Sequence, residues 1–88
     1  MQQLIVERRL AACANILPGM VSHDWWQAKV ARGEEVVALF KTRASLAEPV
    51  RAAIKELQAY DVPAISVIPI ESVDRDYLDW LMDETKPA

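Results

Sequence analysis

The stretch YDVPAISVIPI, residues Tyr60–Ile70, is the part of the sequence on which the predicted fold depends. After Pro63 it is rich in β-branched residues, and both faces of an extended chain would be largely apolar. This pattern predicts a strand that is covered on both sides. Proline cannot donate a hydrogen bond to a sheet, so we expect Pro63 at the start of the strand and Pro69 at its end or at an edge.

Helices are expected on both sides of this strand. Before it, Ser45 and Glu48 form an S-x-x-E capping box, which predicts a helix that begins at Ser45. Its apolar side chains recur at helical spacing: Leu46, Val50, Ala53, Ile54 and Leu57. After the strand, Asp74 is a suitable N-cap for a last helix over Asp76–Thr85. Four side chains of that helix are expected to face inward, with Trp80 at the border: Tyr77, Leu78, Leu81 and Met82.

The first half of the chain predicts a helix and then a hairpin. The helix is expected over Gln3–Cys13, followed by a short extended piece, Ala14–Leu17. Pro18-Gly19 is a turn or bulge signal. Strands are then expected over Met20–Val30 and Val36–Thr42, joined by a turn at Ala31–Glu34 in which Gly33 would take a positive φ. Trp25 and Trp26 are adjacent on the first strand and should point to opposite faces.

Size and composition predict one small domain over residues 1–88. The chain is 52% hydrophobic and 26% charged, so we expect part of its surface to be hidden in an oligomer. The net charge of −3 gives no basic patch for nucleic acid, and no apolar run is long enough to span a membrane. With one cysteine and no signal-peptide pattern, a reducing compartment, the cytoplasm, is expected.

The order of elements is α-β-β-α-β-α, and one more strand at the front would complete a ferredoxin-like fold. Several segments, in order along nearly the whole chain, resemble the CutA divalent-cation tolerance proteins: Glu7–Gly19, Trp26, Glu34–Thr42, Ala59–Pro63 and Tyr77–Leu81. The resemblance implies an α+β class with a ferredoxin-like α/β sandwich, in which helices cover one face of an antiparallel sheet. It also implies a tight homotrimer related to the PII-like proteins, in which long hairpins extend each other's sheets.

The same resemblance implies tolerance to copper and other divalent ions, with no established catalytic activity. Members of the family begin with a strand, whereas this sequence begins inside the first helix, so the first strand is missing from it. Either the sequence starts late, or another segment, such as Met1–Val6 in an extended form, replaces that strand. The family often carries an imidazole where this chain has Gln58, which weakens the copper interpretation here.

Cys13 and His23 are the candidate metal ligands, because copper prefers thiolate and imidazole. One cysteine and one histidine cannot close a four-ligand site within one chain, so Cu(II) or another divalent cation would need residues from several subunits. The simpler interpretation is that Cys13 is a small buried residue at a helix end and that His23 is a solvated strand residue.

Trp26, Lys41 and Tyr60 are candidates for a small-anion site at a subunit interface, formed by an aromatic wall, an ammonium group and a phenol. That site would make the protein a PII-like sensor. The simpler interpretation is that the three residues only pack at the interface. A third hypothesis is a structural trimer that presents Trp25 or Trp26 to a partner. No Ser-His or Cys-His pair and no glycine-rich loop are evident, so we do not expect an enzyme.

Overall fold

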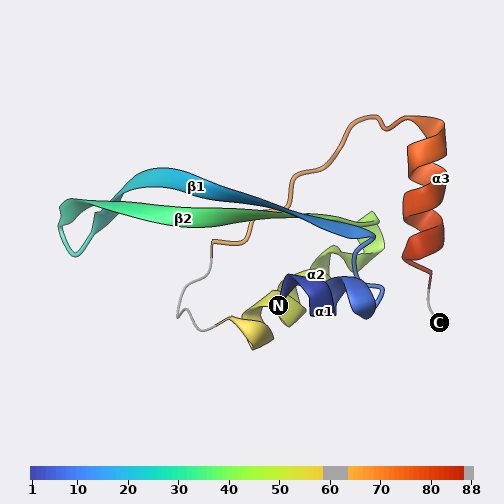
Figure 1. The fold of residues 1–88 in the computed structure, drawn as a ribbon, viewed down its shortest axis with the longest axis horizontal. Helices are drawn as coiled ribbons and strands as arrows, with labels where there is room; N and C mark the ends of the chain where they lie inside the picture. The colour runs from blue at the N-terminus through green and yellow to red at the C-terminus, as the bar shows by residue number, and fades with distance from the viewer. Residues whose placement is uncertain (59–63, 87–88) are drawn as a thin grey trace.

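A long antiparallel hairpin dominates the fold (Figure 1). The computed structural model describes residues 1–58 and 64–86. The hairpin consists of β1 (Cys13–Trp26) and β2 (Lys29–Lys41). Helices α1 (Gln2–Glu7) and α2 (Ala47–Leu57), the latter preceded by the 3₁₀ turn η1 (Ala44–Leu46), lie on one side of it. Helix α3 (Arg75–Glu84) stands beyond its end, and the molecule measures 45 × 26 × 19 Å.

The hairpin turns at Gln27 and Ala28, whose φ angles are 51° and 65°. Trp26 pairs with Lys29 across this two-residue turn. The predicted turn at Ala31–Glu34 is therefore wrong, because Gly33 lies inside β2 and pairs with Ser22. A two-residue turn with positive φ at both positions has a backbone twist that matches the right-handed twist of the flanking strands. The strands therefore stay paired past Gly33, the glycine that suggested a turn.

Pro18 and Gly19 form a bulge, one of the two structures expected for them. Leu17 pairs with Val37 and Met20 with Glu35, so two residues of β1 stand opposite one of β2. Gly19 has a φ of 79°, which glycine adopts without steric cost. The bulge joins the two predicted extended pieces into the single strand β1.

Helix α1 ends much earlier than the predicted helix over Gln3–Cys13. Arg9 has a φ of 63°, and its amide donates to the Val6 carbonyl at 3.0 Å. The Leu10 amide donates to the Ile5 carbonyl at 3.2 Å, which completes a Schellman C-cap. The chain beyond is drawn into the hairpin, where Cys13 pairs with Lys41. Because Gln2–Glu7 is helical, Met1–Val6 does not supply an extended strand.

The core lies where α1 and α2 meet the base of the hairpin. Its buried side chains are Ile5, Ala11, Val50, Ala53 and Ile54. Three of them come from the predicted stripe of α2, which is confirmed. Phe40 of β2 and Ile65 pack against this cluster as half-buried residues. The predicted capping box does not form: the residue that caps α2 is Leu46, it makes no side-chain hydrogen bond, and Ser45 lies in η1.

The strand predicted after Pro63 in the stretch Tyr60–Ile70 is not formed in the part that the structure describes. Residues 64–70 have no regular secondary structure, and the sheet of the described residues contains only β1 and β2. Ile68 and Ile70 are 73% and 69% exposed, so the segment is not covered on both sides as predicted. A run of apolar, β-branched residues makes a strand only where a paired backbone exists, and β2 does not pair with this segment. Tyr60–Pro63 lie outside the described residues.

Helix α3 contacts the rest of the chain less than its sequence predicts. Asp74 is its N-cap, as expected, although its side chain makes no cap hydrogen bond. Of the four side chains predicted to face inward, only Leu81 is buried. The end of α3 is held by Arg43, whose Nε donates to the Thr85 hydroxyl at 2.9 Å. Thr85 is 2% exposed, so this buried hydrogen bond fixes the end of α3 to Arg43, which follows β2.

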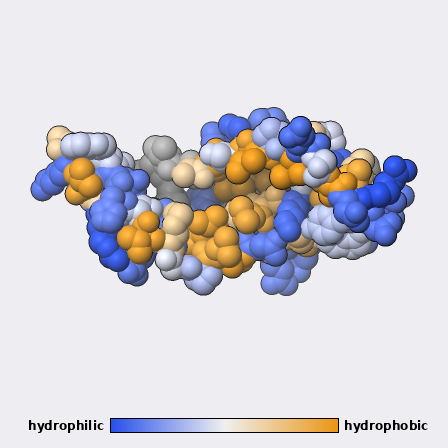
Figure 2. Space-filling model, turned by 90° about the horizontal axis from the view of Figure 1, so that it is seen from above, coloured by the Kyte–Doolittle hydropathy of each residue, from blue (hydrophilic) through white to orange (hydrophobic). Residues whose placement is uncertain are grey.

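Hydrophobic side chains are exposed over much of the hairpin and the segment that follows α2. Figure 2 shows hydrophobic surface gathered over the middle of the molecule, beside a more hydrophilic hairpin tip. The most exposed large apolar residues are Trp25, Trp26, Val36, Ile68 and Ile70. A single chain in water would leave this surface uncovered, which is typical of a protein with an interaction surface. No helix in the described ranges is long and apolar enough to cross a membrane.

The position of the turn gives a direct test. Ala28→Gly should raise the free energy of unfolding by about 1 kcal/mol, because it relieves an L-residue held at positive φ. Gly33→Ala should leave stability unchanged or raise it by up to about 1 kcal/mol, because nothing lies within 4 Å of the added methyl group. Denaturant unfolding of both variants measures this. An unaffected Ala28→Gly, or a strongly destabilised Gly33→Ala, would contradict the observed turn.

Candidate functional site

The predicted residues Trp26 and Lys41 lie at opposite ends of the hairpin. Trp26 pairs with Lys29 next to the turn, and Lys41 pairs with Cys13 at the base. Cross-strand partners and every second residue share a face, so Trp26 and Lys41 are on the same face of the hairpin. That face runs along the 45 Å axis of the molecule, so one chain does not bring these residues together. Tyr60, the third member of the predicted anion site, lies outside the described residues.

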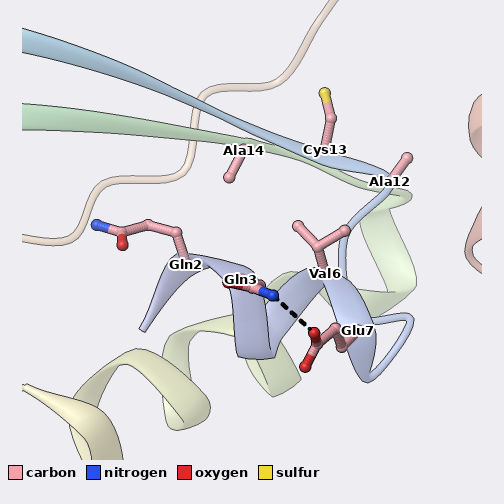
Figure 3. Close-up of a pocket in the computed structure, with 7 residues that line it drawn as sticks. All are labelled: Gln2, Gln3, Val6, Glu7, Ala12, Cys13 and Ala14. Carbon is pink, nitrogen blue, oxygen red and sulfur yellow. Dashed lines mark hydrogen bonds between the residues drawn. The ribbon is translucent and has the colours of Figure 1, made fainter.

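Cys13 and Lys41 meet Tyr77 of α3 at the base of the hairpin. The Tyr77 hydroxyl lies 3.8 Å from the Cys13 Sγ atom, and the Lys41 Nζ atom lies 5.5 Å from the centre of the Tyr77 ring. Trp80 extends this group, with its ring 5.5 Å from that of Tyr77. We call Cys13, Lys41, Tyr77 and Trp80 the base cluster. It combines a thiol, an ammonium group and two aromatic rings. We call the face of the hairpin that carries Cys13 and Lys41, turned away from α1, the outer face (Figure 3).

Tyr77 and Trp80 are the two residues of this cluster that the sequence did not reveal. We predicted both to pack in the core, but they are 38% and 41% exposed. Tyr77 reaches Cys13 across 64 positions of sequence, and no local pattern signals a contact of that separation. Cys13 itself begins β1 and is half-buried, so it is not the residue at a helix end that we expected.

His23 lies far from the base cluster. It is an exposed residue of β1, and its cross-strand partner is Arg32. Asp24, its neighbour in sequence, pairs with Ala31 and therefore points to the opposite face, as predicted. An arginine directly beside the imidazole disfavours a bound cation there by electrostatic repulsion. His23 and Cys13 therefore do not form one ligand set within a chain.

A cavity of about 500 Å³ lies between α1 and the start of β1. Figure 3 shows the side chain of Ala14 pointing toward α1, whereas the Cys13 sulfur points away from it. The Gln3 Nε2 donates to the Glu7 carboxylate at 2.9 Å, so these two polar groups of the cavity satisfy each other. Among residues 1–58 and 64–86, no group of three histidine, cysteine, aspartate or glutamate side chains could hold a metal ion.

Comparison with known proteins assigns the chain to a family. The family model for the CutA1 divalent ion tolerance protein matches residues 1–84. The chain belongs to this family. It is 45% identical to the divalent-cation tolerance protein CutA of Pyrococcus horikoshii, over 93% of this chain and 79% of that protein. It is 39% identical to the rice protein CutA 1, chloroplastic, over 96% of this chain and 48% of the rice protein.

The solved structures of CutA proteins confirm the predicted fold class. The Cut A1 structure from Thermus thermophilus superposes with a TM-score of 0.90 at 40% identity, and the alignment covers 97% of this chain and 82% of that one. The α+β architecture of the chain is therefore the ferredoxin-like fold of the CutA proteins. The resemblance on the segments Glu7–Gly19 and Glu34–Thr42 correctly identified the family.

The base cluster can be tested as an energetic unit. Lys41→Met, Tyr77→Leu and the double variant form a cycle whose coupling free energy should be about 0.5–1 kcal/mol, the typical value of an exposed cation–π contact. Denaturant unfolding of the four proteins measures it. Lys29→Met, at the other end of β2, serves as the control and should show no coupling to Tyr77→Leu. A coupling of zero for Lys41 would mean that the contact does not hold α3 to the hairpin.

Proposed function

We propose that this CutA family member contributes to divalent-cation tolerance by binding a metal ion, with copper as the preferred ion, and not by catalysis. The observation that carries this proposal is the family match over residues 1–84, with relatives named for divalent-cation tolerance. A binding role also agrees with the separation of Cys13 from His23, which leaves the thiol without an imidazole to activate it.

The working unit that we propose is a homotrimer. Trp25 and Trp26 are 77% and 65% exposed in the single chain, and they lie at the tip of a hairpin that extends away from the core. Contact between hairpins of neighbouring subunits would remove these rings from water, at about 25 cal/mol for each Å² of apolar surface. Exposed backbone along the hairpin edge would supply main-chain hydrogen bonds to the neighbour.

The metal site that we propose is shared between subunits. No sufficient ligand set occurs in the described part of one chain, so three copies of a residue must converge or several subunits must each contribute. Cys13 is the best protein ligand available, since copper favours thiolate and the sulfur is half-buried on the outer face of the hairpin. Gln58 occupies the position where the family resemblance led us to expect an imidazole, so we expect weak binding.

Native mass spectrometry with and without one equivalent of Cu(II) per chain tests both parts of this proposal. We expect a trimer that binds either one copper ion or three copper ions. Cys13→Ser should lose this uptake, because it removes the chain's only thiol. His23→Gln should retain it, because Arg32 lies beside that imidazole. A wild-type trimer that stays free of copper would refute the metal role, and a monomer would refute the shared site.

A small-anion site between subunits is the second candidate function. It is supported by the placement of Trp26 and Lys41 at opposite ends of one face, where only a neighbouring subunit could bring the tip of one hairpin to the base of another. Tyr60 is the third residue proposed for it. Such a site would make the protein a sensor of a small anionic metabolite.

Thermal unfolding in the presence of small carboxylates and phosphates tests this second function. A ligand at about 100 times its dissociation constant adds about 2.7 kcal/mol of stability, which should appear as a clear rise in Tm. Lys41→Ala should abolish the rise. Lys29→Ala removes the same charge next to the turn and should retain it. Equal stabilisation of wild type and Lys41→Ala would refute a site that depends on Lys41.

The compartment that we propose is the cytoplasm. The support is the single free thiol, Cys13, which has no cysteine partner within the chain and suits a reducing environment. The rice relative is named as a chloroplastic protein, and we do not extend that compartment to this chain.

A further inference from the structure

A second cavity, of about 300 Å³, lies where the turn after α1 meets η1 and the end of α3. Four cationic side chains line it together with two hydroxyl groups: Arg8, Arg9, Arg43, Lys86, Ser45 and Thr85. No acidic residue is among its lining residues. The chain carries ten lysine and arginine residues and a net charge of −3, so four cations around one cavity are a local concentration of positive charge in an acidic protein.

Two of these cations are held in place by α3. Arg43 donates through Nε to the Thr85 hydroxyl at 2.9 Å and through Nη2 to the Met82 carbonyl. Arg9 donates through Nη1 to the carboxylate of Glu84 and to its carbonyl at 3.4 Å. A guanidinium has five N–H donors, so both side chains keep donors that these bonds do not use. Groups already fixed by the fold lose little entropy when a ligand binds.

The positive charge of the cavity is only partly compensated. Glu84 pairs with Arg9, and Asp83 pairs with Lys86 at 3.1 Å. Arg43 contacts neutral groups, and Arg8 has no ion pair within residues 1–58 and 64–86. Cations at the end of α3 stabilise its terminal carbonyls, which accounts for Arg9 and Arg43. Arg8 is the C-cap residue of α1, where its charge also favours the helix end, and its exposed guanidinium makes no hydrogen bond within residues 1–58 and 64–86.

We propose that this cavity binds a small oxyanion, a phosphate group or a group of similar shape, with Arg8 and Arg43 as the principal donors. Guanidinium groups match the geometry of phosphate oxygens and can each form two parallel hydrogen bonds. The Ser45 hydroxyl adds a neutral donor at the same cavity. This site is separate from the base cluster and from the proposed metal ligands, so it does not depend on the proposed function.

Inorganic phosphate is the probe for a direct test. Calorimetric titration of the full chain, with ionic strength held constant by sodium chloride, should give saturable binding of one phosphate per chain. Arg8→Gln should weaken the affinity about tenfold, since a charge-assisted hydrogen bond is lost. Arg8→Gln should fold normally, because the Arg8 side chain makes no hydrogen bond to described residues; circular dichroism confirms this.

Arg75→Gln is the matched control. The Arg75 side chain is 85% exposed, lies in the first turn of α3 and, among the described residues, pairs only with Asp79, so its loss removes the same charge away from the cavity. We expect its affinity for phosphate to equal that of the wild type. Absence of saturable binding in the wild type, or equal affinities in Arg8→Gln and the wild type, would overturn the proposal. Equal weakening in Arg8→Gln and Arg75→Gln would also overturn it, because the effect would then be one of net charge.

Discussion

The pairing of β1 with β2 is the constraint on which the rest of the structure depends. A two-residue turn at Gln27 and Ala28 keeps the strands in register, and the bulge at Gly19 lets the pairing continue to Cys13 and Lys41. The hairpin therefore extends well beyond the part of it that packs against the core. Helices α1 and α2 cover only its base, where Phe40 packs against their buried side chains. Much of the remaining strand surface has no partner within the described parts of the chain.

This imbalance between strand length and core size explains why function is expected between subunits. An 88-residue domain buries a smaller fraction of its surface on folding than a larger domain does, and large exposed apolar side chains along the hairpin add to the cost of a lone chain in water. Both candidate functions require a neighbour for the same reason. Cys13 belongs to no group of three candidate ligands in ranges 1–58 and 64–86, and Trp26 is separated from Lys41 by the length of the hairpin.

The base of the hairpin is where the separate elements meet. Tyr77 of α3 contacts Cys13 and Lys41 on the outer face, and Arg43 binds the end of α3 through the buried Thr85. The Arg9–Glu84 ion pair is partly exposed, so we assign it little stability of its own. Because Arg43 and Arg9 both contact the end of α3, the attachment of that helix also shapes the cationic cavity beside it. A ligand bound there would contact the same residues that hold the helix.

The sequence by itself determined the features that depend on local pattern. The apolar stripe of α2 and a turn or bulge at Pro18-Gly19 follow from residues close together in the chain, and the membership in the CutA family follows from segments along nearly the whole sequence. Pairing with β2 then made Pro18-Gly19 a bulge. The tertiary structure alone decided where α1 ends, where the hairpin turns and whether the segment at 64–70 becomes a strand. It also decided that Tyr77 meets Cys13. Each of these outcomes depends on backbone pairing or contact between residues distant in sequence, and a strand's periodicity does not specify its partner.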